Sequence, residues 1–238
     1  MNSSCCIILA RGGSKRIPRK NVRNFCGLPM VAWPVQHAVK THLFSEVVIS
    51  TDDKDIAVTA RRYGASFFSL RPEALSNDFA STVDVLQYEL AKIQKRTGTL
   101  PAFCCCLYGT SVFASPLILQ QAYEKIADSD CELLMALVEY SHPIERALQI
   151  SDSGEAVYRQ PAFVASRTQD IKPSYHDSAM FYFFRTQAFF DSGASFLAMK
   201  KAAIVVPKSA VVDIDTEEDW RLAELIYDGY LRRDKEFR

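Results

Sequence analysis

The sequence has 238 residues, 48% of them hydrophobic, and its 28 basic and 28 acidic residues give a formal net charge of zero. This length suits one large α/β domain with enough apolar material for a substantial core. The balanced charge gives no electrostatic reason to expect nucleic acid or an anionic membrane as a partner, and no apolar run approaches the roughly 20 residues of a membrane span. Seven cysteines without C-x-x-C spacing are typical of buried, reduced thiols, so we expect a cytoplasmic protein.

Apolar strands alternate with helical patterns over most of the chain before residue 140. Strands are predicted at 5–9, 46–51, 65–70, 103–108 and 133–138. Helices are predicted at 30–41, from Asp52 or Asp53 to 63, at 81–96 and at 115–127. Such alternation favours an α/β fold, in which a mostly parallel sheet has helices on both faces and binds ligands at the carboxyl ends of its strands.

The pattern changes between about residues 141 and 178, where three prolines and a glycine interrupt short polar and apolar pieces. We interpret this stretch as a β-rich arm inserted in a single domain of residues 1–238, and as the place for a dimer contact. Further strands are then predicted at 179–184, 202–206 and 211–215. Thr216 and Asp219 form a capping-box pattern, which predicts a final helix that ends near residue 231.

The segment that follows the first strand carries two adjacent glycines and a dense group of cations. Gly12 and Gly13 let the backbone approach a ligand closely. The cations, which suit phosphate oxygens, are Arg11, Lys15, Arg16, Arg19 and Lys20. The spacing is neither that of a P-loop nor G-x-G-x-x-G. We interpret the segment as a polyphosphate-binding loop; the alternative, a basic loop that binds nucleic acid, lacks the aromatic side chains on which bases stack.

Two acids near the C-terminus, Asp213 and Asp215, form a second candidate site. On a strand they would point to one face, where two carboxylates repel each other unless a cation lies between them. Mg²⁺ suits this arrangement because it prefers oxygen ligands and also binds substrate phosphates; the alternative is a pair of surface acids ahead of a helix.

A third element consists of Arg71 together with Ser81 and Thr82 at the start of the long helix. The helix start either binds an anion or a base of the ligand, or the two hydroxyl residues only cap the helix.

Taken together, these elements resemble the acylneuraminate cytidylyltransferases, the synthetases of CMP-activated nonulosonic acids. The resemblance rests on segments that span nearly the whole chain in the expected order: Ala10–Lys15, Ile17-Pro18, Lys20-Asn21, Ser50–Asp53, Arg71-Pro72, Asp78–Thr82 and Asp213–Asp219. It implies a Rossmann-like nucleotidyltransferase fold with a small inserted dimerisation arm, and therefore a homodimer.

Within that family the chain is most similar to the pseudaminic acid branch. Arg16 stands where sialic acid enzymes usually have glycine, Leu107–Thr110 replaces a Gln-Pro-Thr-Ser-Pro type of segment, and Tyr175–Asp177 replaces an arginine-containing stretch. Ala179-Met180 departs from the small-Gly-Gln pattern of the family. The alternatives left open are the same chemistry on N-acetylneuraminic, legionaminic or 3-deoxy-manno-octulosonic acid, a glycosyltransferase with a D-x-D metal motif, and a non-enzymatic RNA-binding protein.

The resemblance implies transfer of CMP from CTP to pseudaminic acid, which gives CMP-pseudaminic acid and pyrophosphate for surface glycan or flagellin glycosylation. The implied catalytic residues are Arg11, Lys15, Lys20, Asp213 and Asp215, the last two as ligands of Mg²⁺. The implied nucleotide site consists of Leu9, Ala10, Arg11, Gly12, Gly13, Ser14, Lys15, Lys20, Arg71, Ala80 and Thr82. The implied sugar site consists of Asn21, Tyr108, Arg167, Gln169, His176 and Asp177. CTP and a nonulosonic acid sugar are the implied partners, with no role for nucleic acid or a membrane.

Overall fold

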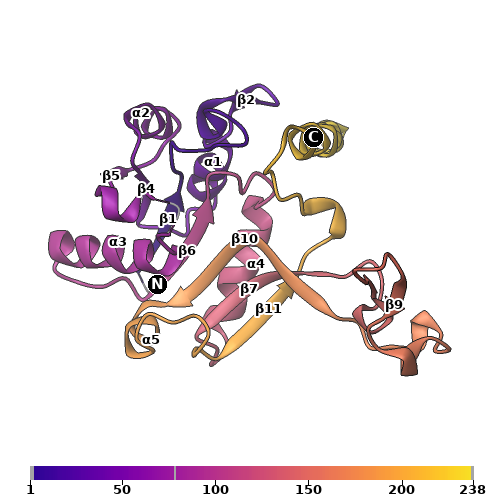
Figure 1. Ribbon diagram of the computed structural model, residues 1–238. Helices are drawn as coiled ribbons and strands as arrows, with labels where there is room; N and C mark the ends of the chain where they lie inside the picture. The colour runs from indigo at the N-terminus through magenta and orange to yellow at the C-terminus, as the bar shows by residue number, and fades with distance from the viewer. Residues whose placement is uncertain (1–2, 78, 237–238) are drawn as a thin grey trace.

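A seven-stranded sheet forms the centre of the protein, in the order β11-β7-β10-β6-β1-β4-β5 (Figure 1). The computed structural model describes residues 3–77 and 79–236, with side chains as far as residue 229, so Asp78 of the family-like segment lies outside the described residues. The strands are β1 (Ser4–Leu9), β4 (Glu46–Thr51), β5 (Phe67–Leu70), β6 (Phe103–Tyr108), β7 (Leu133–Glu139), β10 (Tyr175–Arg185) and β11 (Lys201–Val205). Neighbouring strands pair in parallel, except that β10 runs antiparallel to β6 and β7, which confirms the predicted mostly parallel sheet.

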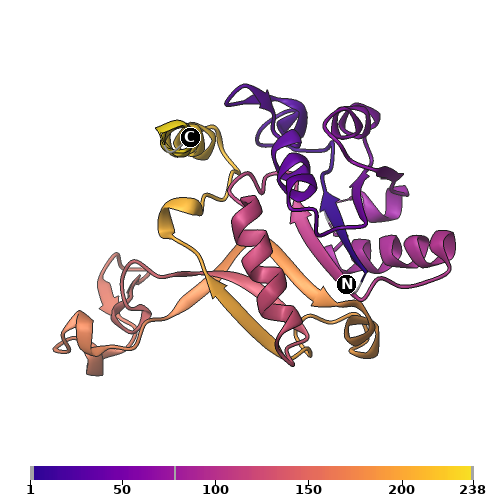
Figure 2. The same ribbon diagram turned by 180° about the vertical axis from the view of Figure 1, so that it is seen from behind.

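Helices cover both faces of this sheet because side chains alternate along each strand. The helices are α1 (Ala32–Lys40), α2 (Lys54–Arg62), α3 (Thr82–Thr97), α4 (Pro116–Ala127) and α5 (Thr186–Asp191). Cys6 and Ile8 of β1 share one core with α1, α2 and α4, and Figure 2 shows α4 lying across that face. Cys5 and Ile7 share the opposite core with α3 and α5. All four side chains are completely buried, so β1 is a central strand. The chain therefore leaves β1 at the carboxyl edge of the sheet, between β6 and β4.

The helices begin close to where the sequence predicts them, because side-chain caps satisfy their first N–H groups. Asp53 accepts hydrogen bonds from the first turn of α2, and Ser81 forms a capping box with Asp84 on α3. Ser115 caps α4, whose first residue is Pro116. The first turns of α2 and α3 therefore border the carboxyl edge of the sheet, α2 directly after β4 and α3 after a 3-10 turn that follows β5.

A third core joins the two ends of the chain. The segment after the glycine loop contains a 3-10 turn (Lys20–Val22) and a two-residue hairpin, β2 (Asn24–Phe25) with β3 (Leu28–Pro29). It packs on α6 (Glu217–Glu236), where Phe25 meets Trp220 edge to face with ring centroids 5.4 Å apart. Both rings are almost completely buried, so this contact sets the position of the acids that precede α6.

The expected strand at 211–215 is wrong. The segment is irregular and lies between a 3-10 turn (Lys208–Ala210) and α6. The N–H of Asp215 bonds within the segment and to the α6 cap, at 3.1 Å from the carbonyl oxygen of Asp213 and 3.1 Å from a carboxylate oxygen of Asp219. A backbone turned on itself in this way is not available to a neighbouring strand, so the two acids are placed by a turn rather than by strand alternation.

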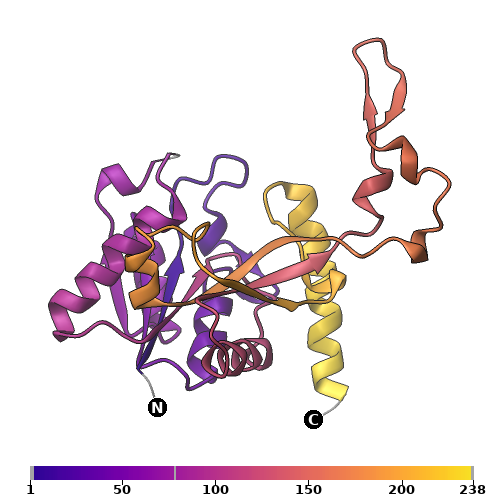
Figure 3. The ribbon, with the colours of Figure 1, turned by 90° about the horizontal axis from the view of Figure 1, so that it is seen from below.

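The arm leaves the sheet between β7 and β10 and projects from the body of the protein (Figure 3). It consists of a short hairpin, β8 (Leu148–Ile150) with β9 (Ala156–Tyr158), and three 3-10 turns. Residues 175–178 of the expected insertion belong instead to β10, because Tyr175, His176 and Asp177 pair with β7. None of the described helices combines the length and apolar character of a membrane span.

We expect Trp220→Ala to lower the free energy of unfolding by about 3–5 kcal/mol, because it removes a buried aromatic side chain and leaves a cavity. Leu225→Ala is the matched control on the same helix: Leu225 is 75% exposed, and its loss is expected to change stability by less than about 0.5 kcal/mol. Urea unfolding of both variants measures the difference, and equal stabilities would contradict the assigned role of the third core.

Candidate active site

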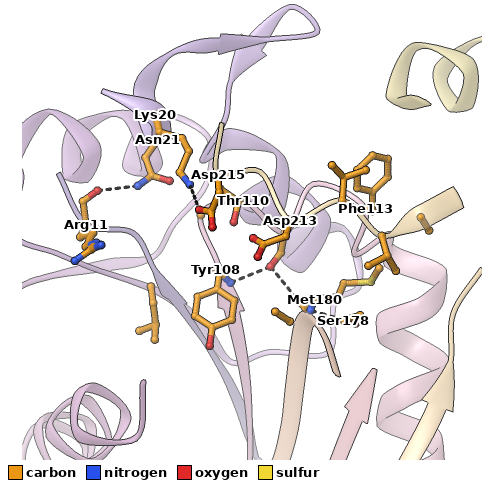
Figure 4. Close-up of a pocket in the computed structure, with 17 residues that line it drawn as sticks. Arg11, Lys20, Asn21, Tyr108, Thr110, Phe113, Ser178, Met180, Asp213 and Asp215 are labelled. Atoms are coloured by element: carbon orange, nitrogen blue, oxygen red, sulfur yellow. Dashed lines mark hydrogen bonds and ion pairs between the residues drawn. The ribbon is translucent and has the colours of Figure 1, made fainter. Parts of the chain in front are cut away.

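A cavity of about 290 Å³ opens at the carboxyl ends of β1 and β6 (Figure 4). The members of the expected catalytic, nucleotide and sugar sites that line it are Leu9, Arg11, Lys20, Asn21, Tyr108, Asp213 and Asp215. The other lining residues are Gly109, Thr110, Ser111, Phe113, Ser178, Ala179, Met180, Ala210, Val211 and Val212. Parallel sheets bind ligands at this edge, so the cavity is the candidate active site.

The glycine loop and the C-terminal acids meet across this cavity. The Nζ of Lys20 donates to the carbonyl oxygen of Ile214 at 2.5 Å and lies 3.4 Å from Oδ1 of Asp215. Arg16 reaches the other oxygen of the same carboxylate at 2.6 Å. The side chain of Lys20 is only 16% exposed, which limits screening of its charge by water. The chain thus gathers cations and carboxylates from its two ends into one site.

The carboxylate of Asp213 lies in an environment that disfavours its charge. Burial raises the pKa of Asp213, and the negative charge of Asp215 adds to the rise, whereas Lys20 opposes it. A cation shared by the two carboxylates would relieve this repulsion. The described residues contain no group of three or more His, Cys, Asp or Glu side chains that could hold a metal, but Mg²⁺ commonly uses one or two carboxylates with substrate phosphates. The pair therefore fits Mg²⁺ bound together with a phosphorylated substrate.

Asn21 holds the loop backbone at the edge of the cavity. Its side-chain Nδ2 donates to the carbonyl oxygen of Arg11 at 2.8 Å (Figure 4), and the residue is 7% exposed. Gly109 lies against it so closely that a Cβ at this position would come within 2.2 Å of the Asn21 Oδ1. The family resemblance implies a place for Asn21 on the sugar side, and in the structure its amide nitrogen also orders the chain after β1.

Tyr108 links the two sides of the cavity. Its hydroxyl lies 2.9 Å from the Thr82 hydroxyl at the start of α3, and burial raises its pKa. Its N–H donates to the Ser111 Oγ, which in turn donates to the carbonyl oxygen of Met180 on β10. Sequence reasoning missed Ser111. The signal was its position just after β6, at the same edge of the sheet as the glycine loop.

Of the expected nucleotide site, Leu9, Arg11 and Lys20 line the cavity, whereas its other members are not part of the lining: Ala10, Gly12, Gly13, Ser14, Lys15, Arg71, Ala80 and Thr82. Arg71 follows β5, and burial lowers the pKa of its guanidinium, whereas the charges of Asp52 and Glu89 oppose this shift. Among the described residues its buried Nε has no hydrogen-bond partner. Buried donors are normally satisfied, so this one marks a place that a ligand or water would complete.

The structure does not bring the arm residues of the expected sugar site into this cavity. Arg167 pairs with Asp170 and, together with that residue, lines a separate cavity of about 550 Å³ in the arm, while Gln169 lies in an adjoining 3-10 turn. His176 lines a third cavity, of about 590 Å³, at the base of the arm. Asp177 accepts a hydrogen bond from the Tyr182 hydroxyl at 2.6 Å. The resemblance identified these residues, but it carried no information on the direction in which the arm projects.

The fold and the cavity define a nucleotidyltransferase: a mostly parallel sheet, a cationic glycine loop after its first strand and an acid pair facing that loop. Residues 5–227 match the model of the cytidylyltransferase family, and the chain belongs to that family.

The chain is 36% identical to a pseudaminic acid cytidylyltransferase of Campylobacter jejuni, over 93% of this chain and 95% of the relative. It is 31% identical to an N-acylneuraminate cytidylyltransferase of Oncorhynchus mykiss, over 96% of this chain and 52% of the relative. Among solved structures, a CMP:2-keto-3-deoxy-manno-octonic acid synthetase complexed with CTP has a TM-score of 0.66 at 16% identity, over 96% of this chain and 99% of the other. That likeness supports the fold.

We expect Gly109→Ala to lower kcat/KM by about a hundredfold, because the added Cβ must displace Asn21 and with it the loop backbone. Gly229→Ala is the control: a Cβ there meets no atom within 4 Å. Steady-state kinetics of both variants provide the comparison, and full activity in Gly109→Ala would show that the contact with Asn21 has no part in the reaction.

Proposed function

We propose that this cytidylyltransferase transfers CMP from CTP to pseudaminic acid and releases pyrophosphate. The observation that carries the proposal is the meeting of Arg11 and Lys20, at the two ends of the glycine loop, with Asp213 and Asp215 in one cavity, in a chain 36% identical over 93% of its length to a pseudaminic acid cytidylyltransferase. A relative in Campylobacter coli, 26% identical, is a post-translational flagellin modification protein, which supports a role of the product in surface glycosylation.

In this proposal the anomeric hydroxyl of the sugar attacks the α-phosphorus of CTP in line, and most of the catalysis comes from positioning and charge neutralisation. Arg11, Lys15 and Lys20 neutralise the triphosphate and the departing pyrophosphate. Asp213 and Asp215 would hold Mg²⁺, which supplies further positive charge to the phosphates and lowers the pKa of the attacking hydroxyl. The N–H of Gly13 and the hydroxyl of Ser14 add donors, whereas the N–H of Gly12 donates to Asp52, so Gly12 contributes through the close approach of its backbone.

The cytidine and the sugar are assigned to opposite sides of Tyr108. Leu9, Ala10, Arg71, Ala80 and Thr82 form the proposed cytidine side, towards α3. Asn21, Tyr108 and the Ser178–Met180 segment of β10 form the proposed sugar side, towards the arm. The hydrogen bond between the Thr82 and Tyr108 hydroxyls supports this division, because it marks where the proposed cytidine side meets the proposed sugar side.

We further propose that the protein is a cytoplasmic homodimer that meets through its arm. Leu148 and Ile150, two residues apart on one face of the arm hairpin, are both more than half exposed, and exposed apolar surface is typical of an interface. An arm from a second copy would then bring Arg167 and Gln169 to the sugar side of the neighbouring cavity. Seven free cysteines, mostly buried, agree with a reducing compartment.

The alternative within the family is the same reaction on N-acetylneuraminic or legionaminic acid. It is supported by the N-acylneuraminate cytidylyltransferase relative and by a CMP-N,N'-diacetyllegionaminic acid synthase of Campylobacter jejuni at 28% identity.

Release of pyrophosphate from CTP and Mg²⁺ is expected with pseudaminic acid and at least about tenfold less with legionaminic, N-acetylneuraminic or 3-deoxy-manno-octulosonic acid. A coupled pyrophosphate assay over this panel tests the proposal. Preference for another sugar would replace the sugar assignment and keep the nucleotide chemistry, whereas no turnover by folded protein with any sugar would overturn the proposed reaction.

Asp213→Asn and Asp215→Asn are each expected to lower kcat by about a hundredfold or more, because each removes a negative charge from the proposed Mg²⁺ site. Asp130→Asn is the control, since Asp130 forms an exposed ion pair with Lys200 away from the cavity. Kinetics over a Mg²⁺ titration measure the effect. Near-normal turnover of both site variants at saturating Mg²⁺ would remove the metal assignment.

A further inference from the structure

Two carboxylates at the end of β4 hold the backbone of the glycine loop. Oδ1 of Asp52 accepts a hydrogen bond from the N–H of Gly12 at 2.7 Å. Asp53 lies very close to the loop. A Cβ added to Gly12 would come within 2.8 Å of the Asp53 Oδ2 and within 2.9 Å of the Asp53 Cβ. Only glycine therefore fits at this position with the loop in its observed place.

The far end of the same loop is tied to Asp53 and to Asp55 in the first turn of α2. Arg19 donates from Nη1 to Oδ2 of Asp53 at 2.5 Å and from Nη2 to Oδ2 of Asp55 at 2.6 Å. Its backbone φ of +57° lies in the left-handed region, which is unfavourable for a residue other than glycine and persists only where surrounding contacts hold it. The two hydrogen bonds that the forked guanidinium of Arg19 donates to Asp53 and Asp55 are such contacts. They hold the strained turn against the chain that follows β4.

We propose that Asp52, Asp53 and Arg19 are positioning residues, which hold residues 11–20 in the shape that receives the triphosphate. This inference rests on the proposed use of the loop for nucleotide binding. Capping of α2 explains only half of the Asp53 contacts: Oδ1 accepts from the N–H groups of residues 55 and 56, whereas Oδ2 faces Arg19. Arg19 is not part of the cavity lining, and its guanidinium pairs with Asp53 and Asp55.

The charge balance gives Arg19 a second effect on nucleotide binding. Asp52, Asp53 and Asp55 place three carboxylates beside a loop that receives a polyanion, and like charges at short range repel. Arg19 is the counter-charge of two of them. The Asp53 side chain is 18% exposed, so water screens it only in part. Loss of Arg19 therefore both loosens the loop and leaves negative charge next to the phosphates.

Asp53→Asn separates the two functions of Asp53. The amide keeps an oxygen for the α2 cap but turns its NH₂ group towards Arg19, where two donors then face each other. We expect KM for CTP to rise about fivefold, because loss of the Arg19 anchor outweighs the removal of one carboxylate beside the phosphates. The value of kcat is expected to stay within about twofold, and Tm close to that of the unmodified protein. The dissociation constant of CTP, measured by calorimetry in the absence of sugar, is expected to rise by the same factor.

Arg19→Ala is expected to raise KM for CTP at least as much, because it also leaves the acids without their counter-charge. Arg19→Lys keeps the charge but loses the fork, so it should recover part of the affinity, which a purely structural role would not predict. Lys200→Ala is the matched control: it breaks an exposed ion pair with Asp130 and should leave KM for CTP unchanged.

The unmodified protein separates the two possible failures. If it neither binds CTP nor turns it over, the proposed function and this inference both fall. If it binds CTP, and folded Asp53→Asn and Arg19→Ala bind CTP equally well, the inference alone is overturned. An unchanged KM with losses confined to Tm and kcat would likewise assign these contacts to folding and overturn the positioning role.

Discussion

The contact of Lys20 and Arg16 with the carboxylate of Asp215 is the interaction on which the site depends. Lys20 and Asp215 are 195 residues apart in sequence, and their attraction joins the chain after β1 to the chain before α6. An ion pair between partly exposed groups contributes at most about 1 kcal/mol, so it cannot position α6 by itself. The buried contact of Phe25 with Trp220 supplies the larger stabilisation, and the ion pairs then orient the acids towards the loop.

The antiparallel strand β10 supplies the opposite wall of the cavity through a local irregularity. Its register with β7 shifts between Asp177 and Tyr182, and Ala179 adopts a φ of +52°. The Asp177 carboxylate accepts a hydrogen bond from the N–H of Ala179, which holds the strained residue in place. Bulges of this kind turn side chains towards neighbouring sites, and here residues 178–180 line the cavity. Ala179 thus adopts, with support from Asp177, a conformation in the region that favours glycine.

The arm residues proposed for sugar recognition lie apart from the cavity proposed for the nucleotide. The loop, the acid pair and Tyr108 lie in the body of the protein, whereas Arg167 and Gln169 lie on the projecting arm. In the proposed homodimer the two groups would meet between copies. Under that proposal, the sheet would keep the geometry of phosphoryl transfer constant, while substitutions in the arm would change the sugar that is accepted. This division agrees with relatives that act on different sugars and share one family model.

The sequence by itself determined the seven strands of the sheet, the helix starts at Ser81 and Ser115, the glycine loop and the resemblance to the family, because alternation, caps and glycine spacing are local properties of the chain. It narrowed the start of α2 to Asp52 or Asp53, and the structure has Asp53 as the cap. Only the tertiary structure decided that residues 211–215 form a turn, since that depends on whether a neighbouring strand is present. It also decided the partners of Asn21, and that Asp53 joins the loop as well as capping α2. Those contacts link residues far apart in sequence, so no local pattern records them.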